Sequence, residues 1–310
     1  MPSPVFPSPL YYADYITLPL PANHRFPADK YEKTRTALIH DLGLPESGFV
    51  RSPLATREEL LTTHAAHYID AVFNGTLPDR AQKRIGFPWS PDFVRRSLAS
   101  TGGTLAAARQ ALKYGYGAQL AGGTHHAHHD FGSGYCVFND FAVTTNVLLA
   151  EGAVKRVAII DLDVHHGDGN ASLLADNPAV LVLSLHGEKN FPSRKPPSDI
   201  DIGLPDQCND TTYLGALEKA LPLVAHFLPD LILYQAGVDG LDCDSLGRLA
   251  LTHEGLETRD RRVFALAHEH NIPLVQVLGG GYSRPIDQTV MAYRNSFRIA
   301  LSFYGTDKPG

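Results

Sequence analysis

The residues best suited to chemistry lie in one short segment, Asp161-Leu-Asp163-Val-His165-His166-Gly-Asp168-Gly. Asp161, Asp163 and His165 alternate with apolar residues, so their side chains project to one side wherever the segment is extended. A buried carboxylate loses several kcal/mol of solvation unless a cation or hydrogen bonds compensate. A lone aspartate would more often cap a helix or face solvent, but this cluster favours a metal site. We therefore predict that Asp163 and His165 bind a metal ion.

The segment Gly237-Val-Asp239 offers the obvious third ligand, Asp239. Imidazole nitrogen combined with carboxylate oxygen suits zinc, with iron(II) as the alternative. Three protein ligands leave one coordination position for water, as hydrolytic chemistry requires.

Two adjacent histidines, His125 and His126, follow Gly122-Gly123, and the glycines allow the backbone to turn there. A histidine near neutral pKa can take a proton from an attacking water and return it to a leaving amine, and a nearby carboxylate orients the ring. Asp161 and Asp168 are available for that purpose. Paired histidines here therefore predict proton transfer.

Other candidates carry weaker signals. His128 and His129 have no comparable partner in the sequence, so we interpret them as structural residues rather than a second metal site. Tyr282 follows three glycines, a turn that could equally cradle a phosphate, but no Walker lysine or Rossmann spacing follows. A phenol near a metal could instead donate a hydrogen bond to the oxyanion of a tetrahedral intermediate.

The elements that must position these residues alternate along the chain. Short β-branched runs predict strands at 117–120, 156–163, 179–185, 230–235 and 272–278. Segments of helical periodicity predict helices at 27–42, 103–114, 139–151, 211–227 and 252–271, with Asp140, Asp210 and Thr252 as N-cap candidates.

This alternation is typical of an α/β fold with a mostly parallel central sheet and helices on both faces. We find no repeat or long linker, so we predict one domain over residues 1–310. Each candidate segment follows the carboxyl end of a strand, where open α/β sheets bind ligands. The sequence therefore predicts one site assembled from four loops.

Bulk properties narrow the class further. The chain has 310 residues, 44% of them hydrophobic, and no apolar run long enough to span a bilayer. Its proline-rich start lacks the pattern of a secretory signal, and three widely spaced cysteines argue against disulfides. A formal net charge of −6 lacks the basic stripe that nucleic acids require. We expect a cytoplasmic protein with no direct nucleic-acid or membrane partner.

Four motifs together resemble the histone deacetylase family, and they occur in order over most of the chain: Gly123-Thr-His125-His126, the segment from Asp161 to Gly169, Gly237-Val-Asp239, and Leu278-Gly-Gly-Gly-Tyr282. Two further stretches, His24-Arg-Phe-Pro and Arg84-Ile-Gly-Phe-Pro-Trp89, are most similar to bacterial, class IV-like members. The resemblance implies the arginase/deacetylase fold and a metal-dependent amidohydrolase that cleaves an acyl group from lysine in a protein or peptide, or from a similar small amine.

The resemblance also implies roles for single residues. Asp163, His165 and Asp239 would bind zinc. His126 would act as general base and acid, oriented by Asp168, while His125, hydrogen-bonded to Asp161, would position the water. Tyr282 would polarise the substrate carbonyl.

An acyl-lysine tunnel and a structural potassium ion are implied in the same way. The tunnel walls would come from Gly134, Tyr135, Phe191, Leu246 and Gly280, for which ordinary core packing is the competing interpretation. Potassium would lie near the backbone of Asp161, Asp163 and His165, the Ser184 hydroxyl and the Leu185 carbonyl.

This sequence departs from similar ones at two positions. Tyr135 stands where many members have phenylalanine, which adds a polar group to a tunnel wall, and Cys243 stands where glycine is usual, which puts the fit of its loop in doubt.

Three alternatives remain. An acetylpolyamine amidohydrolase would use the same amide on a similar stem, and a non-catalytic acyl-lysine binding module would keep the fold without turnover. An arginase-like ureohydrolase would need ligands for two manganese ions. The sequence shows an evident set of ligands for only one metal ion.

Overall fold

The computed structural model describes residues 5–21 and 23–306, so both ends of the predicted 1–310 domain, including the first residues of the proline-rich start, lie outside it. An eight-stranded sheet forms the centre, and every neighbouring pair of its strands is parallel. The spatial order is β2-β1-β3-β8-β7-β4-β5-β6. The bounds are β1 Leu10–Tyr12, β2 Phe49–Arg51, β3 Tyr116–Leu120, β4 Val157–Asp161, β5 Val180–Gly187, β6 Ile200–Leu204, β7 Leu231–Gln235 and β8 Leu274–Val277.

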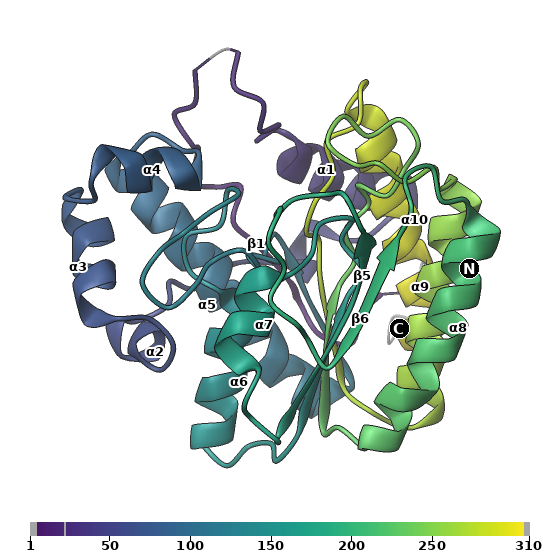
Figure 1. The fold of residues 1–310 in the computed structure, drawn as a ribbon. Coiled ribbons are helices and arrows are strands. Elements are labelled where there is room, and N and C mark those ends of the chain that lie inside the picture. The colour runs from purple at the N-terminus through teal and green to yellow at the C-terminus, as the bar shows by residue number, and fades with distance from the viewer. Residues whose placement is uncertain (1–4, 22, 307–310) are drawn as a thin grey trace.

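Helices cover both faces of this sheet, as Figure 1 shows for α6 and α7 on one side of β5 and β6 and for α8 and α9 on the other. The helices are α1 Lys30–Leu42, α2 Arg57–Leu61, α3 Ala66–Asn74, α4 Asp79–Ile85, α5 Pro91–Tyr114, α6 Asp140–Ala150, α7 Asp168–Leu174, α8 Asp210–Phe227, α9 His253–Glu269 and α10 Asp287–Tyr304. The predicted α/β architecture is therefore confirmed.

The central strands are buried on both faces. Every residue of β3, β4, β7 and β8 is buried, which explains the continuous apolar runs that marked them in the sequence. Strands β1, β2 and β6 were not predicted. The first two are only three residues long, and β6, at the sheet edge, alternates half-buried with exposed residues before its buried last residue.

Two of the predicted helix caps were wrong by one residue. The N-caps of α6 and α8 are Asn139 and Asn209, whose side chains accept hydrogen bonds from the backbone N–H groups of Ala142 and Thr212. Asp140 and Asp210 are the first helical residues instead, while Thr252 caps α9 as predicted.

Helix α5 begins twelve residues before its predicted start, at Pro91 behind the N-cap Ser90. Gly103, where the predicted helix began, lies inside the helix together with Gly102. A Cβ at Gly102 would collide with the backbone oxygen of Pro53, so the glycine permits close packing rather than a turn. Helices α2, α3, α4, α7 and α10 were also not predicted, and none of the described helices is long and apolar enough to cross a membrane.

Candidate active site

The four predicted loops converge at the carboxyl ends of the central strands. They follow β3, β8, β7 and β4, which are adjacent in that order, so their carboxyl ends meet. The loop after β3 carries His125 and His126, and the loop after β4 carries Asp163 and His165. Asp239 follows β7 and Tyr282 follows β8.

Asp163, His165 and Asp239 bring three potential ligand atoms within 4.8 Å of one another. The His165 Nδ1 lies 3.0 Å from Asp163 Oδ1 and 3.1 Å from Asp239 Oδ2. The remaining carboxylate oxygens are held by the protein, since Asp163 Oδ2 accepts from the backbone N–H of Gly280 and Asp239 Oδ1 from that of Val164. This leaves one oxygen of each carboxylate and one imidazole nitrogen facing a common point.

The electrostatics of this group call for a cation. Burial, together with the Asp163 carboxylate, raises the pKa of Asp239 to about 7. Burial alone would lower the pKa of His165, but the two carboxylates raise it to about 10. A proton on His165 thus offsets only part of the charge of two carboxylates, and a divalent metal would supply two positive charges while leaving the imidazole free as a ligand. The residues fit a metal of the zinc or iron(II) type.

The two histidines beside this group each bond a carboxylate. His125 Nδ1 lies 2.7 Å from Asp161 Oδ2, and His126 Nδ1 lies 2.5 Å from Asp168 Oδ1. Gly122 and Gly123, which precede them, have φ values of 83° and 72°, so the backbone makes the turn that the glycines suggested.

The charge preferences of the two histidines differ. Burial disfavours a charge on both, but Asp161 and Asp163 raise the pKa of His125 to about 9. For His126, burial and the neighbouring His125 together lower the pKa to about 3, against the opposing effect of Asp168. His126 is therefore the neutral member of the pair at pH 7.

Tyr282 is fixed through its backbone. The carboxylate of Asp244 accepts from the Tyr282 N–H at 2.6 Å, and the Ser245 hydroxyl donates to the Tyr282 carbonyl at 2.7 Å. Burial, followed by the charges of Asp163 and Asp239, raises the pKa of the phenol well above its usual value. Tyr282 thus keeps its proton and can donate a hydrogen bond.

These groups open into a cleft of about 620 Å³. Of the predicted tunnel residues, Gly134, Tyr135, Phe191 and Leu246 line it, together with His126, His165 and Tyr282. A Cβ at Gly134 would meet the His126 ring at 2.7 Å, so this glycine lets the wall approach the histidine. Gly280 lies elsewhere: it is not a lining residue of the cleft, and a side chain there would collide with the Asp239 carboxylate.

The interpretation of His128 as partnerless was wrong. Its Nε2 lies 3.0 Å from Asp168 Oδ2, so one carboxylate serves both His126 and His128. His129 fits the structural interpretation, because its Nδ1 contacts only the Thr63 carbonyl among the described residues.

Three residues that sequence reasoning missed support the site. Lys30 donates to the carbonyls of Gly279 and Gly281 at 3.1 and 3.3 Å, Asp244 holds Tyr282, and Gln235 Nε2 donates to Asp163 Oδ2 at 3.2 Å. Asp244 follows shortly after Asp239 in the sequence, and Gln235 ends a strand, so the positions of both residues could have marked them as part of the site. Lys30 gave none, because it lies 249 residues from Gly279.

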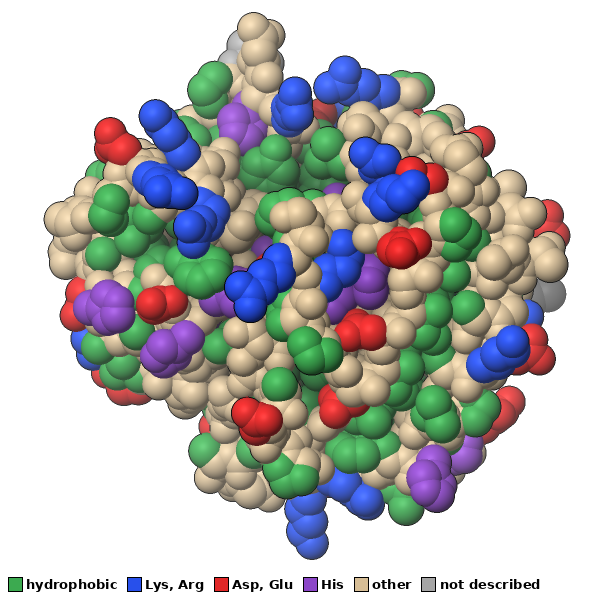
Figure 2. All heavy atoms as spheres, viewed as in Figure 1, with side chains coloured by type: hydrophobic (Ala, Val, Ile, Leu, Met, Phe, Trp, Pro, Cys, Tyr) green, Lys and Arg blue, Asp and Glu red, His purple; other side chains and the backbone are tan. Residues whose placement is uncertain are grey.

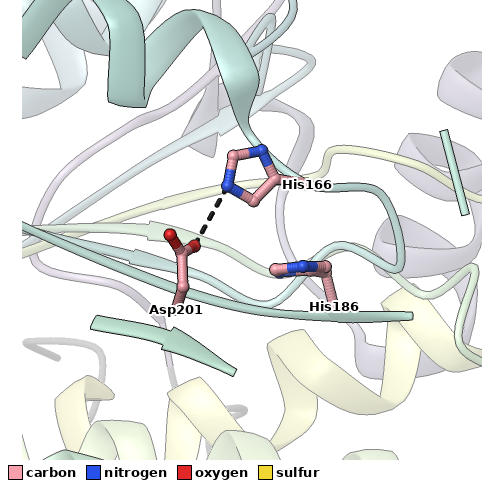
Figure 3. Close-up of side chains that lie close together, drawn as sticks. All are labelled: His166, His186 and Asp201. Carbon is pink, nitrogen blue, oxygen red and sulfur yellow. Dashed lines mark hydrogen bonds and ion pairs between the residues drawn. The ribbon is translucent and has the colours of Figure 1, made fainter. Parts of the chain in front are cut away.

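A second group of potential ligands lies next to the first, on β5, β6 and the loop after β4 (Figure 3). It comprises His166, His186 and Asp201. His166 Nε2 lies 3.0 Å from Asp201 Oδ1, and His186 Nδ1 lies 3.0 Å from the Ser184 hydroxyl. Asp201 is the exposed member, with 31% of its side chain accessible. Ser184, a predicted potassium ligand, is also the register partner of Asp161 in the β4–β5 pair.

Comparison with known proteins agrees with this arrangement. The model of the histone deacetylase domain family matches residues 24–296. The chain is 40% identical to an uncharacterized protein of Picosynechococcus, covering 95% of this chain and 98% of that one, and 32% identical to the acetoin utilization protein AcuC of Bacillus subtilis, covering 97% and 82%. The crystal structure of a histone deacetylase homologue from Aquifex aeolicus superposes with a TM-score of 0.78 at 29% identity, covering 94% and 84%.

The fold and the site thus define a hydrolase with the arginase/deacetylase architecture. The chain belongs to the histone deacetylase family, and its similarity to bacterial members is confirmed.

Proposed function

We propose that this protein hydrolyses the amide of an acylated lysine, or of a closely similar amine, with zinc bound by Asp163, His165 and Asp239. The observation that carries the proposal is that one member of the metal-ligand group, His165, lines the same cleft as the carboxylate-bound His126 and the protonated Tyr282. A metal ion there would act as a Lewis acid toward the amide carbonyl and make water more acidic.

Side chains of the protein would carry out proton transfer and stabilise the developing negative charge. Asp168 holds the Nδ1 of His126, so Nε2 is left to accept a proton from the attacking water and to return it to the leaving amine. Asp161 orients His125, whose positive charge favours the developing anion. The Tyr282 hydroxyl donates to the oxyanion as it forms. Collapse of the tetrahedral intermediate releases the carboxylate and the amine.

The tunnel walls suit an apolar lysine stem. Phe191 and Tyr135 lie on the cleft, and the Phe191 ring contacts the His126 ring edge-to-face with centroids 4.8 Å apart. We also propose the structural potassium ion near Asp161 and Ser184, and a cytoplasmic location, which the free cysteines Cys136, Cys208 and Cys243 support.

The deciding experiment compares acetyl-lysine, lactyl-lysine and longer acyl-lysine peptides with acetylpolyamines, using zinc-loaded protein. We expect turnover of acyl-lysine peptides, and we expect His126→Ala to lower kcat by about 10²- to 10⁴-fold because proton transfer is lost. His67→Ala, which changes an exposed histidine outside the cleft, is the matched control.

Turnover confined to acetylpolyamines would move the assignment to that alternative. Peptide binding that His126→Ala leaves intact, with no turnover of any substrate, would identify a binding module instead.

A further inference from the structure

The mouth of the cleft is basic although the whole chain carries a formal net charge of −6. Its lining includes Lys83, Arg84, Lys189 and Arg248, and no aspartate or glutamate among the described residues. All four cationic side chains belong to exposed residues, so they face whatever approaches the cleft. The charge at the entrance is thus opposite in sign to the charge of the molecule.

The four cations come from three segments of the chain. Lys83 and Arg84 belong to the end of α4, while Lys189 follows β5 and Arg248 lies in the long loop after β7. Figure 2 shows Lys and Arg side chains gathered over the upper and central parts of this face, around apolar side chains. A chain lying across the cleft would therefore meet positive charge on both sides of the bound residue.

Two of these side chains are held in place. The Arg84 guanidinium lies over the Phe131 ring, 4.7 Å from its centroid, and Arg248 Nη1 lies 3.1 Å from Asp206 Oδ2. Lys189 approaches the same Asp206 oxygen at 3.8 Å. A single carboxylate cannot neutralise both Arg248 and Lys189, and the Lys83–Arg84 wall has no carboxylate partner within the described part of the chain, so the rim keeps a net positive charge.

Such a rim acts on the residues that flank a bound acyl-lysine. Charges around a cleft attract oppositely charged partners and penalise like-charged ones. The effect is short-ranged, because the Debye length is about 8 Å at physiological ionic strength, so it reaches only a few residues beyond the mouth.

We propose that the basic rim selects acyl-lysines with acidic neighbours in a protein or peptide chain. The proposal rests on the acyl-lysine hydrolase activity proposed above and specifies its substrate class. The same rim disfavours the polycationic tail of an acetylpolyamine and peptides rich in lysine and arginine.

The test uses three acetyl-lysine peptides of equal length whose flanking residues are glutamate, glutamine or lysine, with full-length, zinc-loaded protein. We expect kcat/KM to fall in that order and the glutamate peptide to exceed the lysine peptide by about tenfold or more at low salt. Raising the ionic strength should shrink this ratio, because the rim is exposed.

Two double variants locate the effect. In Lys83→Gln/Arg84→Gln the glutamate-to-lysine ratio should fall at least threefold. Lys113→Gln/Lys155→Gln removes the same charge near the amino ends of β3 and β4, which lie away from the cleft at the carboxyl ends. This control should leave the ratio unchanged.

The outcomes separate the two proposals. Turnover of the glutamine peptide with a flat or reversed charge ranking would overturn the rim proposal and leave the proposed function standing. An absence of turnover on all three peptides would overturn the proposed function itself. A ranking that follows charge equally in both double variants would assign the effect to overall charge and also reject the rim.

Discussion

His125 and His126 are adjacent in the chain but differ in what they can do. The two carboxylates near His125 outweigh the effect of burial, and they hold its pKa near 9. His126 has one carboxylate partner and a cationic neighbour, which leaves it neutral. The sequence alone could pair them with acids, but it could not distinguish their charges, because those depend on distances set by the fold.

A third buried histidine, His64, makes a prediction for stability. Its Nδ1 donates to the His128 carbonyl and its Nε2 accepts from the Asn139 N–H, so only the neutral ring satisfies both bonds. Burial lowers its pKa from 6.5 to about 4. The unfolded chain therefore takes up this proton first, and stability is lost as the pH falls from about 6.5 to about 4.

We expect the free energy of unfolding to fall by about 2 kcal/mol between pH 7 and pH 5 through His64 alone. Urea unfolding of the parent protein and of His64→Gln at both values measures this, since the variant should lose less stability on acidification. His67→Gln, at an exposed position, should behave like the parent. An identical pH dependence in His64→Gln would contradict the assignment.

The hydroxyl of Tyr135 makes a prediction for substrate choice. The ring lines the cleft, and its centroid lies 6.3 Å from that of Tyr282. If the hydroxyl bonds a polar acyl group, Tyr135→Phe should lower the lactyl-to-acetyl ratio of kcat/KM by roughly three- to tenfold, the value of one hydrogen bond. Competitive turnover assays measure this ratio, with Tyr114→Phe at the far end of α5 as control. An unchanged ratio would reject the hypothesis.

At the scale of elements, the turn after β8 depends on two residues that hold it from outside. Lys30, at the start of α1, bonds two glycine carbonyls, and its Nζ lies 4.8 Å from the centroid of the Tyr282 ring. Asp244 bonds the backbone of the same tyrosine. A glycine-rich turn has little intrinsic rigidity, so these contacts determine where the phenol lies.

We expect Lys30→Met to lower kcat more than it changes KM, because two buried carbonyls lose their donor and Tyr282 shifts. Each unsatisfied group costs about 1–3 kcal/mol, so the melting temperature should also fall. Lys30→Arg keeps the charge and should restore part of kcat. Lys33→Met removes an exposed lysine of the same helix and should change neither quantity. Equal kcat in Lys30→Met and the parent protein would contradict this positioning role.

Among the strands, the sequence predicted those that are buried on both faces and missed those at or next to the edges of the sheet. The five predicted strands exist, with ends shifted by a few residues, since strands that are covered on both faces are marked by apolar runs in the sequence. Edge strands such as β6 and short helices such as α4 lack that signal. The motif residues of the site were predictable, since each follows a strand. Lys30 was not, because its partners come from the other end of the chain.

For the molecule as a whole, metal binding and stability are coupled. Asp163 and Asp239 are buried anions, so an ion that binds them in the folded state stabilises that state. Zinc at a hundred times its dissociation constant should add about 2.7 kcal/mol to the free energy of unfolding, and a chelator should remove it. Thermal unfolding with and without zinc measures the shift.

Matched variants identify the group that is responsible. Asp239→Asn should abolish the zinc-dependent rise in melting temperature, whereas His186→Gln, in the second group, should retain it. The reverse pattern would place the principal metal at His166, His186 and Asp201.

The strand order has a consequence for how the chain is made. Strand β8 lies between β3 and β7, so the last strand in the sequence joins the two parts of the sheet. A nascent chain on the ribosome has β1 to β7 available well before residue 277, but both β3 and β7 still expose an unpaired edge. The site can close only after Tyr282 has been synthesised, because Tyr282 follows β8. Until then the unpaired edges of β3 and β7 can pair with other exposed strands, so the incomplete chain is prone to aggregation.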